Sequence, residues 1–364
     1  MAATGAFAQS FVQIDGVMDV GLQSNNYMGN KASGIANNGA ATSQINFRGT
    51  EDLGGGLKAN FRVETDWNTV SNKGNTGAAG GGSTFGNGEL RVGLAGGFGS
   101  IDAGAVNYNT LGTFLTGQPF GTAIGSGFRA VAGNDAQGAI AGTNFNGFSG
   151  SQVRSDNSVK YTSPSFSGFN GTLYYAAKQS KVNATPQINP QAPAFSTTLG
   201  GYDMQGTTEL GLNYSNGPLA ASFSSLKQDY KDVGAFGHKA TINTLGVNYA
   251  FGAAKVFLLN QSSKLEQVGA LKANYMAISG TYTLGNAVLM ASFGQLKDKT
   301  EGSDGQKTKL AALGADYNLS KRTAVYARYE SINDKIGVVA APAGFATYSS
   351  DKRTRTAIGV KHSF

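Results

Sequence analysis

Long segments of alternating apolar and polar residues restrict the fold of this chain more than any other feature. A period of two is the period of a β-strand whose two faces differ. The alternation here runs for about ten residues, whereas strands of globular domains more often have five or six. About ten tilted residues match the thickness of a bilayer, so these segments are predicted to be membrane-spanning strands. The first such segment, after Phe11, has Val12, Ile14, Gly16, Met18, Val20 and Leu22 on one face and Gln13, Asp15, Asp19 and Gln23 on the other.

The segments are joined by two kinds of connection that alternate along the chain. Seven connections are short, among them "EDLGGGLK", "GGFGS", "NYSNGPLA" and "TYTLGNAV". Four of the seven follow a tyrosine, namely Tyr214, Tyr249, Tyr282 and Tyr317. Short turns at one end and long polar loops at the other are typical of a bacterial outer-membrane β-barrel. Seven short turns and eight long loops predict about sixteen antiparallel strands. The long loops are expected at residues 24–42, 68–88, 106–153, 180–206, 227–240, 262–273, 297–308 and 331–352.

Composition supports an all-β fold and excludes several other classes. The 53 glycines, 15 tyrosines and 21 phenylalanines favour strands and turns. Mean hydropathy is −0.20, and no run approaches the roughly 18 apolar residues of a spanning helix. With no cysteine, the chain has neither disulfides nor thiolate chemistry. Its net charge of +7 comes from scattered lysines and arginines, so we expect no nucleic-acid partner.

The two ends of the chain carry further signals. The start, "AATGAFAQS", has small residues at Ala6 and Ala8, as at the end of a secretory signal. Residues 1–8 are therefore interpreted as a residual export-signal segment and residues 9–364 as a single barrel domain. The final stretch "AIGVKHSF" alternates up to Phe364. A closed barrel has no free edge, so this strand is expected to pair with the first, with Phe364 at the periplasmic interface.

The chain resembles the general porins of Gram-negative bacteria, in the style of the betaproteobacterial and neisserial branch. The resemblance is carried by "INFRGTEDLGGGLKANFRVE", "NYSNGPLAASF", "YNLSKRTAVYARYE" and "TAIGVKHSF", which are spread over nearly the whole chain. It implies a homotrimer of sixteen-stranded barrels whose third extracellular loop folds inward as a constriction. It also implies that Phe364 is an assembly signal for the barrel-assembly machinery. Outer-membrane lipid and lipopolysaccharide are further implied partners.

The loop at residues 106–153 is the natural constriction loop, and it departs from the family's pattern. Related loops often have Glu between Pro and Phe, but here Phe120 follows Pro119 directly. The family often has Arg where this chain has Gln44, and a "GRQ"-like strand end where it has Gly104-Ala105-Val106. In the family, carboxylates on this loop face arginines on the barrel wall and set up an electric field across the pore. Both groups are fewer here, which predicts weak ion selectivity.

Basic residues predominate on the parity opposite to the apolar face. The residues expected to line the pore or its constriction are Arg48, Arg62, Arg91, Arg129, Arg154, Lys160, Gln44, Glu89, Pro119 and Phe120. Arg129 belongs to the constriction loop, and Arg154 is expected at the narrowest point. An electropositive lining of this kind favours small anions, whereas a merely solvated polar lining has no preference.

Residues suited to catalysis or metal binding are sparse. The two histidines, His238 and His362, lack a recognisable partner motif, and no spacing typical of a metal site is found. No enzyme activity and no cofactor are expected. The leading hypothesis is passive diffusion of small hydrophilic solutes and ions through a water-filled outer-membrane pore with weak anion preference. The alternatives are a porin that prefers organic acids, a surface-exposed adhesin-like barrel, and a soluble β-sandwich.

Overall fold

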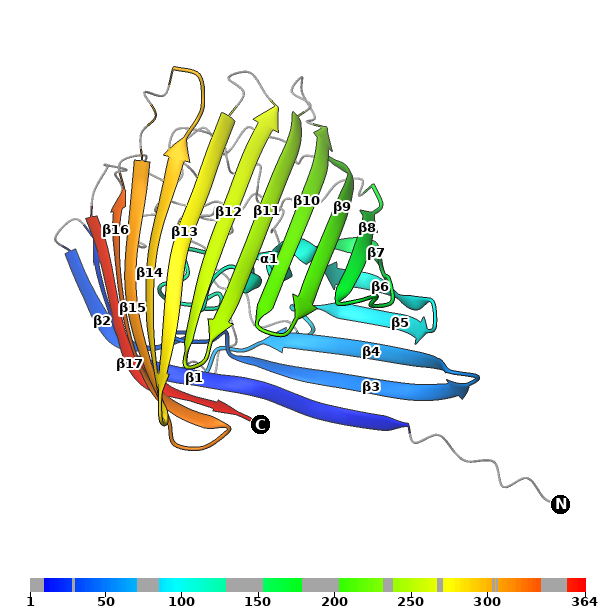
Figure 1. Cartoon of the computed structure of the whole chain (residues 1–364), viewed down its shortest axis with the longest axis horizontal. Helices are drawn as coiled ribbons and strands as arrows, with labels where there is room; N and C mark the ends of the chain where they lie inside the picture. Colours follow the sequence, from blue (N-terminus) through cyan, green and yellow to red (C-terminus); the bar gives the residue numbers. More distant parts are fainter. Residues whose placement is uncertain are drawn as a thin grey trace.

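The structure is a computed structural model in which the described residues form seventeen antiparallel strands and one short helix. Consecutive strands pair around a closed barrel (Figure 1). The prediction of an all-β barrel of about sixteen strands is confirmed, with β2 as one additional strand. The structure describes residues 10–27, 30–70, 85–128, 153–178, 203–231, 238–266, 271–302, 305, 307–334 and 352–364. The predicted export-signal segment lies outside the described residues.

The elements follow one another in a simple up-and-down order. They are β1 (Phe11–Tyr27), β2 (Asn30–Asn37), β3 (Gln44–Gly54), β4 (Leu57–Asp66), β5 (Leu90–Gly96), β6 (Gly99–Asn107), α1 (Asn109–Thr116), β7 (Arg154–Thr162), β8 (Phe169–Ala176), β9 (Asp203–Asn216), β10 (Leu219–Lys231), β11 (His238–Phe251), β12 (Ala254–Glu266), β13 (Leu271–Leu284), β14 (Ala287–Asp298), β15 (Lys307–Asn318), β16 (Thr323–Asp334) and β17 (Lys352–Ser363).

The barrel closes between its first and last strands. The β1–β17 register runs from Val17 opposite Ser363 to Tyr27 opposite Arg353. Gly16 and Phe364 then exchange two backbone hydrogen bonds of 3.1 Å, so the ladder continues to the last residue. On its other edge, β1 pairs with β3 through its first half and with β2 through its second half. Both edges of β1 are therefore paired, as a strand in lipid requires.

Short turns join the strands at one end of the barrel. The turns that follow β11 and β13 place Gly252 and Gly285 at a φ of 58°, a left-handed conformation that glycine adopts without steric cost. The helix α1, which follows β6 and precedes β7 in the chain, lies inside the barrel (Figure 1). Within the described residues, no helix is long and apolar enough to cross a membrane.

Three predicted loops are shorter than expected because the strands continue into them. The region expected as a loop at 24–42 contains the end of β1 and all of β2. Likewise, β10 continues to Lys231 and β12 to Glu266, with β11 and β13 beginning at His238 and Leu271. Polar residues predominate in these strand ends, so apolar alternation weakens there while backbone pairing goes on. The sequence pattern marks the apolar band rather than the full strand.

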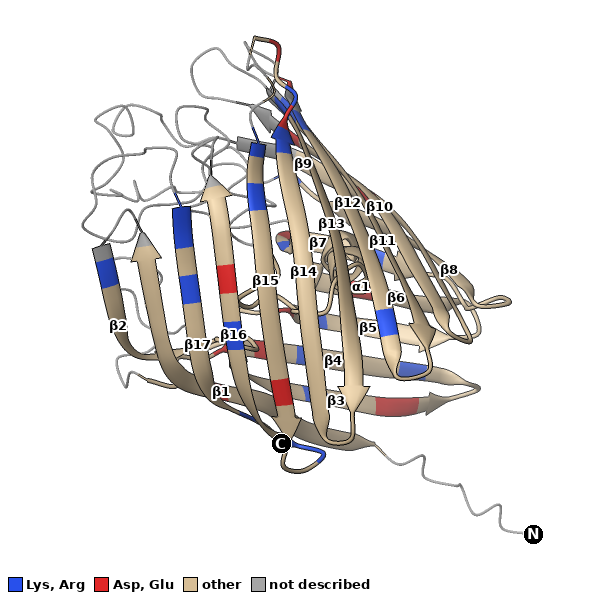
Figure 2. Ribbon diagram, turned by 60° about the vertical axis from the view of Figure 1, so that its left-hand side comes forward, with Lys and Arg blue, Asp and Glu red and all other residues tan. Residues whose placement is uncertain are grey.

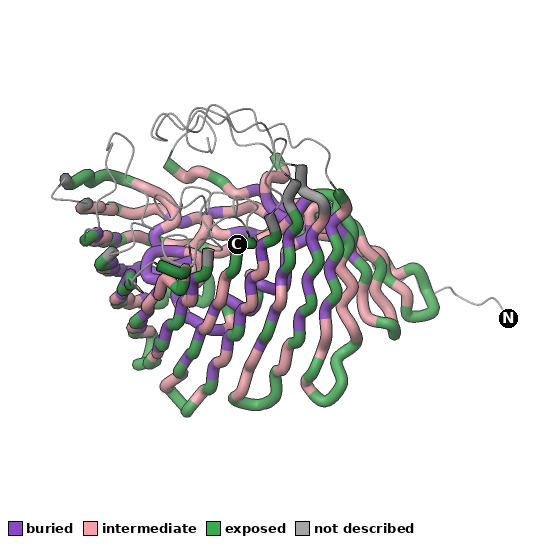
Figure 3. Tube along the Cα trace, turned by 90° about the horizontal axis from the view of Figure 1, so that it is seen from above, coloured by how far each residue is buried: buried purple, intermediate pink, exposed green. Residues whose placement is uncertain are grey.

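The wall has an apolar outer face and a polar inner face. Val12 and Ile14 on β1 are 71% and 57% exposed, whereas Asp19 on the opposite parity is buried. Viewed from above, buried residues gather where the inner wall meets the segment that contains α1 (Figure 3). The predicted assignment of faces for β1 is confirmed. The main core of this barrel lies between the wall and an internal segment.

Candidate functional site

Residues 108–128 form an internal segment that lies against the inner wall. Its helix, α1, begins with no side-chain cap of its own. The carboxylate of Glu209, on β9, instead accepts hydrogen bonds from the backbone N–H groups of Asn109 (2.5 Å) and Thr110 (2.7 Å) and from the Thr110 hydroxyl (2.7 Å). A carboxylate at a helix N-terminus satisfies free N–H groups and complements the helix dipole. A wall residue thus fixes the start of the internal helix.

Hydroxyl groups continue this attachment along the helix. Thr110 and Thr113 bond to Ser224 (2.9 Å) and Ser222 (2.6 Å) on β10. On β11, a side chain at Gly246 would collide with the Thr113 carbonyl oxygen and the backbone of Gly117. Glycine at this position lets the helix approach the wall at backbone distance. The helix is therefore held by a polar seam along β9, β10 and β11.

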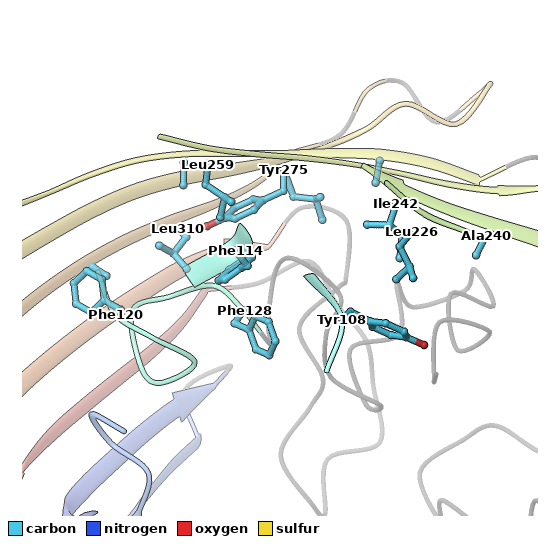
Figure 4. Close-up of a cluster of buried hydrophobic side chains, with 14 of the residues drawn as sticks. Tyr108, Phe114, Phe120, Phe128, Leu226, Ala240, Ile242, Leu259, Tyr275 and Leu310 are labelled. Carbon is cyan, nitrogen blue, oxygen red and sulfur yellow. The ribbon is translucent and has the colours of Figure 1, made fainter. Parts of the chain in front are cut away.

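An apolar cluster fills the space between the internal segment and the wall (Figure 4). Phe114 of α1 stacks edge-on against Phe128 at a ring-centroid distance of 4.8 Å. Leu259, Tyr275 and Leu310 contribute from the wall and are almost fully buried. Burying side chains of this size contributes about 1.5–3 kcal/mol each relative to exposure. The segment is consequently anchored by packing as well as by hydrogen bonds.

The far end of the segment, residues 117–128, reaches the opposite side of the barrel. The Gly125 N–H donates to the carboxylate of Glu330 on β16, at 3.0 Å. The Thr122 hydroxyl bonds to that of Thr42, which precedes β3, at 2.9 Å. Gln118 closes the intervening turn by accepting from the Phe120 N–H at 2.7 Å. The segment therefore bridges the interior between Glu209 on β9 and Glu330 on β16, and narrows the passage.

Tyr108 precedes the helix and is buried against side chains of β7, β8 and β10. Its hydroxyl bonds to the hydroxyl of Ser155 and accepts a hydrogen bond from Gln228 at 3.2 Å. Its ring meets that of Tyr174 edge-on at 4.7 Å. Burial raises the pKa of Tyr108 to about 12. The phenol is therefore neutral at physiological pH and serves as a packing and hydrogen-bonding group.

The first charge set contains three arginines in a row and the four carboxylates that pair with them. Arg48 on β3 lies opposite Arg62 on β4, which lies opposite Arg91 on β5. Like charges in directly opposed positions repel one another unless acids intervene. The ion pairs are Arg48–Asp15 (2.7 Å), Arg62–Glu64 (2.5 Å), Arg62–Glu89 (2.8 Å), Arg91–Glu89 (3.7 Å) and Arg91–Asp102 (2.5 Å).

Two further basic residues of the predicted site lie beside the first charge set. Arg154 donates to the carbonyl oxygen of Asn87 at 2.5 Å, and Lys160 donates to that of Asn107 at 3.0 Å. The Asn107 N–H in turn donates to Glu89 at 3.0 Å. The structure thus gathers Arg48, Arg62, Arg91, Arg154, Lys160 and Glu89 on one side of the barrel.

The remaining residues of the predicted site are dispersed. Gln44 begins β3 opposite Asp66 and is half-buried. Pro119 and Phe120 lie in the internal segment, with Pro119 half-buried and Phe120 buried. Phe120 faces β16, where the Arg328 guanidinium lies 5.9 Å from its ring centroid. Arg129 lies outside the described residues.

The second charge set lies on β15, β16 and β17, on the other side of β1 from the first set. It contains Arg328, Arg353, Arg355 and Lys361 with the carboxylates of Asp316 and Glu330 (Figure 2). Glu330 accepts two hydrogen bonds from Arg355, at 2.7 and 2.9 Å, and lies 3.5 Å from Arg353. Asp316 is shared by Arg328 and Lys361, each at 2.7 Å. Each carboxylate in this set serves two cations.

A buried carboxylate next to the second charge set belongs to a different contact. Asp19 on β1 accepts hydrogen bonds from the backbone N–H groups of Gly39 (3.2 Å), Ala40 (2.8 Å) and Ala41 (2.7 Å). It also accepts one from the Tyr326 hydroxyl at 2.6 Å. Four donors saturate this anion, which fixes the chain between β2 and β3 against the wall.

The described part of the chain holds no group of three or more His, Cys, Asp or Glu residues that could bind a metal ion. His362 bonds to the Thr323 hydroxyl on the exposed face at 2.8 Å. Charged and polar groups instead line a barrel that a polar, well-anchored segment narrows. This arrangement is suited to the passage of hydrated solutes.

Comparison with protein families decides between this interpretation and other barrels. A family model described as Gram-negative porin matches residues 1–337. This chain belongs to the Gram-negative porin family. The proposed resemblance is confirmed, and with it a channel-forming barrel in the outer membrane.

Individual relatives agree with that assignment. The porin is 31% identical over 381 residues to outer membrane porin protein 32 of Delftia acidovorans, covering 100% of this chain and 97% of the relative. It is 28% identical over 392 residues to major outer membrane protein P.IA of Neisseria meningitidis, covering 89% and 90%. The family and the Delftia relative are described as porins, and the Neisseria relative is described as a major outer membrane protein.

Solved structures show the same architecture. An anion-selective porin from Comamonas acidovorans is 26% identical, with a TM-score of 0.76, and the match covers 98% of this porin and 100% of that chain. OmpT of Vibrio cholerae, at 15% identity and a TM-score of 0.63, covers 100% of both chains and supports the fold alone.

Sequence reasoning missed several interior groups of this porin. Glu209, Glu330, Arg353 and Arg355 were not expected to act together. Parity could have placed Arg353, Arg355 and Lys361 on the inner face, because they alternate with Ile358 and Val360. The partnership of Glu209 with α1 has no such local signal, since about a hundred residues separate the two.

Proposed function

We propose that this porin passes small hydrophilic solutes and ions by diffusion, without a catalytic step, and favours anions weakly. The observation that carries the preference is the second charge set, in which four basic side chains share two carboxylates. Among the described residues of this set, cations outnumber carboxylates by four to two, beside the end of the segment that narrows the passage. The side chains of Arg355 and Lys361 are 26% and 28% exposed, so solutes can approach them.

The first charge set contributes less to this preference. Its three arginines face four carboxylates, so cations are not in excess among the described residues of this set. We propose that Arg48, Arg62, Arg91, Arg154, Lys160, Gln44, Glu89, Pro119 and Phe120 line the pore and its constriction. In this role the arginine row orients solutes, while the second charge set supplies most of the bias.

A weak preference follows from the magnitudes. Two unit charges about 4 Å apart in water interact by roughly 1 kcal/mol, which changes local ion concentration about fivefold. Salt screens part of this effect. The Comamonas relative is an anion-selective porin, which supports the same sign of preference here.

A preference for organic acids is a second candidate. Arg353 and Arg355 lie two residues apart on one face of β17, and Arg355 already holds Glu330 through two hydrogen bonds. Guanidinium groups bind carboxylates in this two-point geometry. A small dicarboxylate could therefore compete for these side chains where a chloride ion cannot.

The assembled state is also proposed. We infer a homotrimer in the outer membrane, in contact with lipopolysaccharide and assembled by the barrel-assembly machinery. Phe364 is the proposed assembly signal, and its ring lies against Gly16 of β1. Phe364→Ser should lower the amount of assembled trimer in cells more than it lowers refolding yield in detergent. Equal trimer levels in cells for both proteins would refute the signal.

The selectivity proposal is tested by the zero-current potential across a potassium chloride gradient in a planar bilayer. Wild type should give a small potential of the anion-selective sign. Arg355→Glu removes one cation and adds one anion beside Glu330, so it should reduce or invert that potential. A cation-selective wild type would overturn the proposal, and the organic-acid candidate fails if succinate does not reduce chloride conductance.

A further inference from the structure

Lysines cluster on the outward face of the barrel, at the loop ends of four neighbouring strands. The outward parity of these strands is marked by the exposed residues Leu258 on β12, Ile278 on β13, Phe293 on β14 and Leu313 on β15. The lysines share that parity and lie nearer the loop ends. They are Lys264, Lys272, Lys297, Lys299, Lys307 and Lys309, and we call them the lysine band.

The strand register places members of the lysine band directly against one another. Lys264 lies opposite Lys272, and Lys297 lies opposite Lys307. The Lys299 N–H also bonds to the Lys272 carbonyl oxygen at 2.8 Å, which extends the ladder between β13 and β14. Residues paired in this way have Cβ atoms about 4.5–5.5 Å apart, and like charges there are destabilising. An anion placed between opposed lysines would remove this repulsion.

Acidic side chains of the same surface do not provide that charge. Among the described outward-facing residues of β12 to β15, Glu266 is the only acid, and it pairs with Lys264 at 2.8 Å. Asp298 has the inward parity and accepts from the Thr300 N–H at 2.8 Å. Glu301 is exposed in the turn beyond β14. Six lysines thus share one outward carboxylate on the strands themselves.

The position of the lysine band indicates which anion it meets. Met276, Phe293 and Leu313 are more than half exposed and belong to the apolar band that faces lipid. The lysines lie beyond this band on the side of the long loops, and Figure 2 shows basic residues at the loop end of β15. Headgroups lie at that boundary, and lysine stems can extend along apolar surface toward them. Solutes inside the barrel meet the opposite face of these strands.

We infer that the lysine band binds the phosphate groups of outer-leaflet glycolipid, an inference that rests on the proposed contact with lipopolysaccharide, with opposed lysines sharing a phosphate between strands. A phosphate placed between Lys297 and Lys307 replaces their repulsion with two charge-assisted contacts. Each lysine close to an anionic membrane surface strengthens binding about fivefold. The band therefore fixes lipid against β12 to β15, a region separate from both internal charge sets.

The test compares two double variants of the purified full-length porin in detergent. Lys297→Gln with Lys307→Gln removes one opposed pair. Lys31→Gln with Lys321→Gln is the matched control, because both lysines are exposed and lie outside the band, one on β2 and the other in the short turn between β15 and β16. Binding of diphosphoryl lipid A and of its dephosphorylated form is measured by native mass spectrometry at several salt concentrations.

We expect the first double variant to bind diphosphoryl lipid A at least about tenfold more weakly than wild type, and the control to stay within about twofold. Binding of the dephosphorylated lipid should be equal in all three proteins. Without lipid, the first variant should unfold in urea no earlier than wild type, because a repulsive pair is gone. Equal losses in both double variants, or equal affinity of wild type for the two lipids, would overturn the inference.

Discussion

The two internal charge sets differ in how their cations are neutralised. On β3 to β5, three arginines stand in a row and pair with four carboxylates. Each arginine contacts at least one of these carboxylates. On β15 to β17, four cations share two carboxylates, and one of these also holds the internal segment. The number of arginines on a wall therefore says little about its field. What matters is how many cations each carboxylate serves.

The two sets also differ in what depends on them. Glu330 is fully buried and joins Arg353, Arg355 and the Gly125 N–H. Asp15 joins Arg48, whose side chain is 44% exposed, and Asn46. Removing one partner of a buried ion pair leaves a buried charge uncompensated, whereas an exposed pair contributes little. The comparison therefore predicts unequal effects of equivalent mutations.

The largest effect is expected for Glu330→Gln. The change leaves Arg353 and Arg355 without their carboxylate and should lower the free energy of unfolding by about 3–5 kcal/mol. It should also release the end of the internal segment, which increases current noise in single-channel recordings. Urea unfolding followed by circular dichroism measures the first effect. A loss below about 1 kcal/mol would show that the second charge set does not support the fold.

A smaller effect is expected for Glu209→Gln. The amide oxygen can still accept from one N–H group of α1, but the charge that complements the helix dipole is lost. Loss of a helix cap costs about 0.5–2 kcal/mol. The same urea titration measures it, and the α1 end of the segment should become more accessible to protease. Unchanged stability and protection would show that packing around Phe114 suffices.

The smallest effect on stability is expected for Asp15→Asn. Its partner Arg48 is partly solvated, so the loss should stay within about 1 kcal/mol. In the same unfolding assay, a loss equal to that of Glu330→Gln would remove the distinction between the two charge sets.

Sequence periodicity was sufficient to predict the barrel, because the two faces of a strand in lipid must differ along its whole apolar span. The faces of β1 and the pairing of Phe364 with the first strand follow from that rule. Strand ends beyond the apolar band did not follow from it, as the continuation of β10 to Lys231 shows.

The candidate site was predictable only in part. Parity identified Arg48, Arg62 and Arg91 as inward-facing, together with Asp15 and Glu89, but not which acid pairs with which arginine. Those partners depend on register between strands and on Glu89, which precedes β5. The contact between Gly125 and Glu330 spans about two hundred residues and depends on how the internal segment folds. No pattern within either stretch specifies that contact.

The zero-current potential of matched charge reversals, one in each charge set, tests the central claim most directly. Arg355→Glu and Arg48→Glu each change the formal charge by two units, and potentials are recorded across a potassium chloride gradient at low and high mean salt. The account predicts a weakly anion-selective wild type, a larger shift toward cations for Arg355→Glu than for Arg48→Glu, and a smaller difference at 1 M salt, where screening extends only about 3 Å. Equal shifts for the two variants, or a larger shift for Arg48→Glu, would contradict it.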